Sequence, residues 1–170
     1  MPAYPDTIYD PRTKANRSGV VYDAEKETVL FAEDIEKLDD EVVEIETDLE
    51  GRKYSITLII DGGGSAITTG IKGFLEIPFA CTIEKVTLLA DISGSIVVDI
   101  WKDIYANFPP TDADTITSAT PPTITTAVKS QDSTLTTWTK AIAAGSVLAF
   151  NVDSATTITR LTVSLTVKKT

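Results

Sequence analysis

Apolar residues recur at intervals of four and three along an acidic stretch between residues 31 and 49. This is the spacing of the a and d positions of a coiled coil, which lie on one side of a helix and pack against a partner helix. The sequence therefore predicts an oligomerising helix within residues 23–51. Its seam is formed by Phe31, Ile35, Leu38, Val42, Ile45 and Leu49. A single amphipathic helix that packs on its own domain is the alternative.

The positions that flank this seam are all acidic, namely Asp39, Glu41, Glu46 and Asp48. In a parallel homo-oligomer these side chains repel one another instead of forming ion pairs. The mixture of β-branched residues and leucine in the seam is compatible with two or three strands. A strand-like segment at residues 28–31 precedes the helix, and Gly51 is a typical residue for its C-terminal end.

Beyond Gly51 the pattern changes to alternating apolar and polar residues with many β-branched types. Turns are expected at Pro78 and at residues 91–94. A long connection over residues 102–122 is expected to hold a short helical turn capped by Thr111. Residues 52–170 are therefore predicted to form a mainly β domain, an antiparallel jelly-roll-like sandwich. Its strands are expected at residues 54–60, 73–77, 82–90, 94–101, 123–128, 147–151 and 158–167.

Residues 1–22 show no periodicity and contain three prolines. Such a segment buries too little apolar surface to order by itself, so it is either a disordered tail or an arm that orders against a partner. Its aromatic and arginine residues favour an extended anchoring arm, because these types are enriched in interfaces. The candidate anchoring residues are Tyr4, Ile8, Tyr9, Arg12 and Arg17.

The net charge of −10 is concentrated in the predicted helix. Residues 23–50 contain 13 of the 25 acidic residues and only two bases, Lys26 and Lys37. The remainder is nearly neutral and has no basic stripe, which argues against nucleic-acid binding. No run of eighteen apolar residues predicts a membrane span, and the N-terminus lacks a signal-peptide pattern.

Little in the sequence indicates catalysis. There is no histidine, and the many serines and threonines have no evident base to activate them. The single cysteine, Cys81, lies in the apolar run IPFACTI and is expected to be a buried, unreactive thiol. The glycine-rich residues 61–65 lack the GK[ST] of a phosphate-binding loop and are expected to be a flexible connection. We expect no enzyme, no cofactor and no bound metal.

Aromatic residues in the second half of the domain could form a platform for a sugar ring. These candidate glycan contacts are Trp101, Tyr105, Phe108 and Trp138, with core or corner positions for Trp101 and Phe108 as the alternative. A glycosidase would require a carboxylate pair across a cleft, for which Asp99 and Asp103 are the candidates. The spacing of Asp112, Asp114 and Asp132 matches no calcium-binding loop.

Several segments carry a resemblance to a known class of proteins. The run GFLEIPFACTIEKVTLLADISGSIVVDIWKDIYANFPP is followed by KSQDSTLTTW, IAAGSVLAFNVDS and TRLTVSLTVKK. Over residues 67–170 the chain resembles a C-terminal β domain that recurs in tailed-phage virion proteins. The N-terminal YDPRTKANRSGVVYD, followed by TVLFAEDIEKLDDEVVEIET, also looks like phage structural proteins.

This resemblance implies a homotrimeric structural protein on a virion surface, made in the cytoplasm of a host bacterium. Residues 1–22 would attach it to the phage capsid or to another virion protein, residues 23–51 would trimerise it, and residues 52–170 would form an outward knob. We expect a capsid-surface head fibre or decoration protein whose knob adheres weakly to glycans. The alternative is a tail fibre or receptor-binding protein whose knob binds the host surface.

Overall fold

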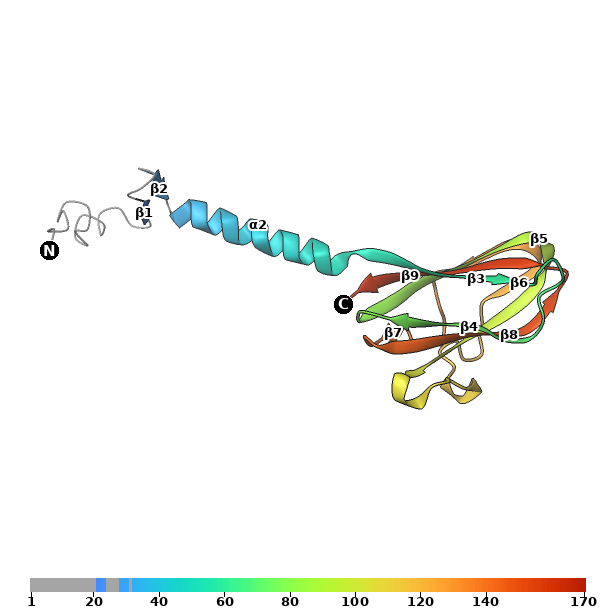
Figure 1. The fold of residues 1–170 in the computed structure, drawn as a ribbon. Coiled ribbons are helices and arrows are strands. Elements are labelled where there is room, and N and C mark those ends of the chain that lie inside the picture. The colour runs from blue at the N-terminus through green and yellow to red at the C-terminus, as the bar shows by residue number, and fades with distance from the viewer. Residues whose placement is uncertain (1–20, 24–27, 31) are drawn as a thin grey trace, which may run out of the picture. The chain divides into compact units, whose positions relative to one another are not determined.

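The computed structural model describes residues 21–23, 28–30 and 32–170 of the chain (Figure 1). The chain divides between Leu49 and Glu50 into two units, which we describe separately. The predicted anchoring arm, and with it Tyr4, Ile8, Tyr9, Arg12 and Arg17, lies outside the described residues.

The first unit contains a short β-hairpin followed by a helix. Strands β1 (Val21–Asp23) and β2 (Thr28–Leu30) are antiparallel, with Val21 opposite Leu30. Helix α2 (Ala32–Gly51) comes after β2, so the strand-like segment noted in the sequence precedes the helix, which starts later in the chain than residue 23. The helix ends at Gly51 as expected, but Gly51 is its last helical residue and lacks the left-handed φ of a C′ glycine.

The second unit is mainly β and antiparallel, as the alternating pattern predicted. Two single turns of 3-10 helix, η1 (Tyr105–Asn107) and η2 (Asp112–Asp114), interrupt the connection after β5. The strands are β3 (Lys53–Asp61), β4 (Gly70–Ile77), β5 (Cys81–Ile104), β6 (Thr123–Asp132), β7 (Ala141–Ile142), β8 (Ser146–Thr156) and β9 (Arg160–Lys169).

These strands form one curled sheet in the order β3-β9-β5-β8-β4, and β6 and β7 also pair with β5. The curl arises because β5 changes partner along its length. Its first half, Cys81 to Ala90, pairs with β9, and its second half, Ser95 to Ile104, pairs with β8. Figure 1 shows the resulting two layers, with β3 and β9 in one and β4 and β8 in the other.

The turn expected at residues 91–94 is a bend within one continuous strand. The pairing of β5 with β6 shifts register between Leu89 and Gly94, which lets the strand turn from one layer to the other. The β8–β9 turn packs directly against this bend, and a Cβ atom on Gly94 would collide with the Thr156 carbonyl. Only glycine fits at such a close approach of two backbones.

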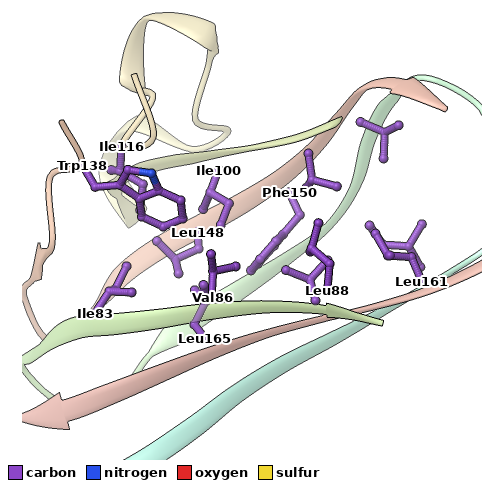
Figure 2. Packing of buried hydrophobic residues seen from close by; sticks show 14 of the residues in the cluster. Ile83, Val86, Leu88, Ile100, Ile116, Trp138, Leu148, Phe150, Leu161 and Leu165 are labelled. Carbon is purple, nitrogen blue, oxygen red and sulfur yellow. The ribbon is translucent and has the colours of Figure 1, made fainter. Parts of the chain in front are cut away.

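The core lies between the two layers of the curled sheet. Alternate residues of β9 are fully buried, and the threonines and serine between them face outward. Figure 2 shows Val86 and Leu165 of one layer pointing toward Leu148 and Phe150 of the other. Burial of a large aliphatic or aromatic side chain contributes about 1.5–3 kcal/mol, so this interdigitated cluster is the main source of the stability of the unit.

Candidate functional site

The apolar stripe of α2 is exposed along the described part of the helix. We use this name for Leu38, Val42, Ile45 and Leu49, which follow one another at intervals of four, three and four. Their side chains are 44–59% exposed. Phe31 and the side chain of Ile35, which complete the predicted seam, lie outside the described residues. The four described positions therefore present a row of unburied aliphatic side chains on one helix face.

The rest of α2 is strongly polar, and every described residue from Glu36 to Leu49 is exposed. No helix in the described ranges has the length and apolar character of a membrane span. Val43 is also exposed, at 60%, but lies beside the stripe at a position that a heptad leaves outside the seam. The stripe suits contact with another apolar helix face better than contact with water.

The two tryptophans expected to contact glycans are buried. Trp138 is in the core, and its indole Nε1–H donates to the Thr120 carbonyl at 3.0 Å. Trp101 lies on the outer side of β5, and its Nε1–H donates to Asp99 Oδ2 at 2.7 Å. Neither ring is available as a sugar platform, so this prediction is corrected for both tryptophans. The alternative, a packing role, holds for Trp101.

The other two predicted aromatic contacts reach the surface. Tyr105 is 80% exposed in η1, and Phe108 is about half exposed. Phe108 packs edge-on against Phe74 of β4, with ring centroids 4.7 Å apart. Ile104 beside them is also exposed, so the end of β5 presents a small apolar rim. The four predicted residues are therefore not brought to one surface, but two of them remain accessible.

Asp99 organises the connection between β5 and β6. Its carboxylate is buried and accepts hydrogen bonds from the Ile100 N–H and the Trp101 indole, each at 2.7 Å. The hydroxyls of Thr115 and Thr117 donate to the same group at 2.7 and 2.5 Å. A charge removed from water requires such donors, and here they tie the connection to the outer face of β5. The carboxylate is occupied by structural contacts instead of facing a cleft with Asp103.

The other acidic candidates also accept internal hydrogen bonds. Asp103 accepts the Ile104 N–H at 2.7 Å. The N–H and hydroxyl of Thr111 each donate to Asp114 Oδ2 at 2.8 Å, so the predicted cap at Thr111 is part of a local turn. These bonds hold the pKa of Asp114 below its usual value. Asp132 accepts the backbone N–H groups of residues 134 and 135.

No three residues within the described ranges gather as metal ligands. Cys81 is buried, and burial raises the pKa of its thiol. A thiol with a raised pKa has little thiolate at neutral pH and is a poor nucleophile. This agrees with the structural role expected for the apolar run around Cys81.

The β domain has a hydroxyl-rich face that was not predicted from the sequence. Thr57, Ser164, Thr87 and Gln131 stand side by side across β3, β9, β5 and β6. Ser55 and Ser164 hydroxyls lie 2.8 Å apart, and Gln131 Nε2 donates to Thr87 Oγ1 at 2.9 Å. The alternation of threonine and serine along β9 was a signal for this face. The cross-strand register was needed to show that the hydroxyl-bearing residues of neighbouring strands lie side by side.

Charged side chains form hydrogen bonds and an ion pair at the end of the domain where β3, β5 and β9 meet. Arg160 donates to Asp61 Oδ2 through Nε at 2.9 Å and through Nη2 at 2.8 Å. Asp91 accepts from the Thr159 hydroxyl and, at 3.0 Å, from the Arg160 N–H. These donors, with the Thr159 hydroxyl first, lower the pKa of Asp91 to about 2.

Comparison with family models, curated proteins and solved structures yields no match to this chain.

Proposed function

We propose that this chain is a structural protein that self-associates through α2 and displays its β domain. The observation that supports this proposal most directly is the exposed apolar stripe of Leu38, Val42, Ile45 and Leu49. An isolated helix of this length is marginal in water, and exposed aliphatic side chains add no stability to it. Packing the stripe of one copy against that of another would bury these aliphatic side chains and stabilise the helix.

The proposed assembly is a homotrimer on the surface of a phage particle, most simply a capsid head fibre or decoration protein. The virion placement and the number three rest on the resemblance of residues 9–23, 28–47 and 67–170 to phage structural proteins. In this proposal residues 1–22 anchor the trimer to the capsid or to another virion protein. The protein would be made in the cytoplasm of the host bacterium.

We further propose that the displayed domain is a jelly roll. The pairing order supports this topology when each half of β5 and β6 is counted as a strand. One layer then contains β3, β9, the first half of β5 and the end of β6. The other contains β4, β8, the second half of β5 and the start of β6. Two four-stranded layers joined by continuous strands are typical of this fold.

The alternative is a tail fibre or receptor-binding protein whose knob adheres to glycans of the host surface. Tyr105 and Phe108 offer apolar ring surface for a sugar. The uncharged row of Thr57, Thr87, Ser164 and Gln131 offers donors and acceptors that suit a polyol. These surfaces support adhesion without distinguishing a head from a tail position.

Immunogold labelling of phage particles with an antibody against residues 52–170 tests the placement. Gold distributed over the heads is the expected result and would support a head fibre or decoration protein. Gold confined to the tail tip would support the receptor-binding alternative. Purified particles that bind no gold, although the antibody recognises the isolated protein, would refute a virion role.

A further inference from the structure

We propose that β3 is an intersubunit strand, whose free edge is covered by a second copy of this chain. The inference rests on the proposed self-association and extends it from the helix to the β domain. Strand β3 ends the sheet order, and among the described strands it pairs only with β9. One edge of this strand therefore presents backbone N–H and C=O groups without a partner strand in the described part of the chain.

The edge of β3 lacks the features that normally prevent strand pairing. Its nine residues pair with β9 without a shift of register. From Tyr54 to Ile60 the strand contains no charged residue and no proline. Natural sheets protect exposed edges with charges, bulges or prolines, because an unprotected edge pairs with other chains. The uncharged segment Tyr54–Ile60, with its unbroken register, is the form of edge that a partner strand can join.

The two other long edge strands show the contrast. Strand β4 contains Lys72 and Glu76 and has an irregular register between Ile71 and Gly73. Strand β6 contains Lys129 and a positive φ of 47° at Thr126, and its pairing with β5 shifts twice. Both edges are bent and charged, as expected of strands that remain in water. Protection is thus missing from β3 in particular.

Apolar surface adjoins the free edge of β3. Ile56 and Leu58 of β3 and Leu75 of β4 are only partly buried at the margin of the core. A groove of about 340 Å³ runs between the two strands, lined by residues 54–57 and 75–79. Ile59, farther along β3, is 61% exposed. A partner at this edge would gain apolar contact in addition to backbone hydrogen bonds.

Charge and chain length favour a second copy of this chain as the partner. The acidic charge is concentrated in residues 23–50 and the β domain is nearly neutral, so two copies of the domain can meet without strong electrostatic repulsion. The uncharged segment Tyr54–Ile60 adds no like charges to such a contact. A single residue, Arg52, separates the end of α2 at Gly51 from the start of β3 at Lys53. That link spans at most about 7 Å, so association of the helices would hold the first residues of β3 strands near one another.

Hydrogen exchange of the full-length protein, read by mass spectrometry of peptides, tests the inference. We expect peptides from β3 to exchange at least about tenfold more slowly than peptides from the edge strand β6. The protection of β3 should fall in the variant L38D/I45D if that variant is monomeric. An oligomer whose β3 exchanges as rapidly as β6 would overturn the inference while leaving helix assembly intact.

Sedimentation of the same samples separates the inference from the proposed function. A wild-type chain that is monomeric would refute both. A variant L38D/I45D that remains oligomeric, with β3 protected, would support the intersubunit strand and refute the role of the helix.

A matched pair of substitutions gives a second readout. Ile59→Lys places a charge on β3, and Val128→Lys places the same charge on β6, where the native side chain is 46% exposed. Both native side chains are exposed, so both variants should keep the native near-ultraviolet spectrum. We expect I59K to weaken association by about tenfold or more and V128K to leave it unchanged. Equal association of the two variants would overturn the inference.

Discussion

The exposed stripe of α2 leads to a quantitative prediction about assembly. In the variant L38D/I45D, two aliphatic side chains of the stripe become carboxylates. If the stripe is the seam of a homotrimer, each substitution removes three apolar contacts and places three like charges in the seam. We therefore expect the full-length variant to be monomeric at concentrations at which the wild type is trimeric.

The magnitude follows from the exposure of the native side chains. Full burial of a leucine or isoleucine contributes about 1.5–3 kcal/mol. Leu38 and Ile45 are 55% and 59% exposed, so seam contact can still bury roughly half of each, or about 1 kcal/mol per side chain. A trimer loses six such side chains, or about 6 kcal/mol, which lowers its association constant by about four orders of magnitude.

Sedimentation equilibrium measures this change directly. Val43→Asp is the matched control, because Val43 is 60% exposed on the same helix but lies outside the stripe. It introduces the same residue type in the helix interior, so its cost in helix propensity is similar to that of each single substitution in L38D/I45D. A variant L38D/I45D that retains the wild-type mass, or a variant V43D that dissociates to the same extent as L38D/I45D, would refute the role of the stripe as the seam.

Three further predictions concern charge and buried polar groups. Raising salt from about 0.01 to about 1 M should stabilise the trimer, because it shortens the screening length between the acidic flanks of the stripe from about 30 to about 3 Å. The thermal midpoint of the trimer should therefore rise with salt, and salt-induced dissociation would contradict the prediction. The pKa of Asp91 is lowered to about 2, so its stabilisation is complete above the unfolded value of 3.8 and is lost as the pH falls toward 2. Urea midpoints should therefore decline over that window, and D91N should show a smaller decline. Asp99→Ala would leave buried donors of Trp101 and Thr117 unsatisfied and should cost about 2–5 kcal/mol in urea unfolding. A loss equal to that of the more exposed D103N would contradict the role assigned to Asp99.

Much of the secondary structure of the β domain could be predicted from local patterns. The alternation in β9 and the β-branched run in β3 identify strands, because side chains on successive residues face opposite sides of a sheet. The predicted turn at residues 91–94 was wrong in kind, since the chain bends there without leaving the sheet. Turn-forming residues also occur at bulges, and only the pairing of β5 with β8 and β9 distinguishes a bend within a strand from a turn between two strands.

Some of the candidate site residues could likewise be predicted from local spacing, and others depended on the tertiary structure. The stripe of α2 is a local property of sequence spacing, and its role in association stays a prediction, because every described residue from Glu36 to Leu49 is exposed. The aromatic residues are different, because Trp101 and Trp138 found buried hydrogen-bond acceptors that lie close only in the folded chain. Composition does not indicate whether a tryptophan will be buried or exposed, since its large ring is suited to either environment.

The sequence by itself determined the acidic helix with its apolar spacing and the β character of residues beyond Gly51. Both follow from interactions between neighbours a few residues apart, so local pattern is sufficient. The tertiary structure alone decided that Asp99 is a buried anchor, that the outward threonines and serines align in rows, and that β3 lies unprotected at an edge. These properties depend on which distant strands become neighbours, and that choice is made by burial of the whole core.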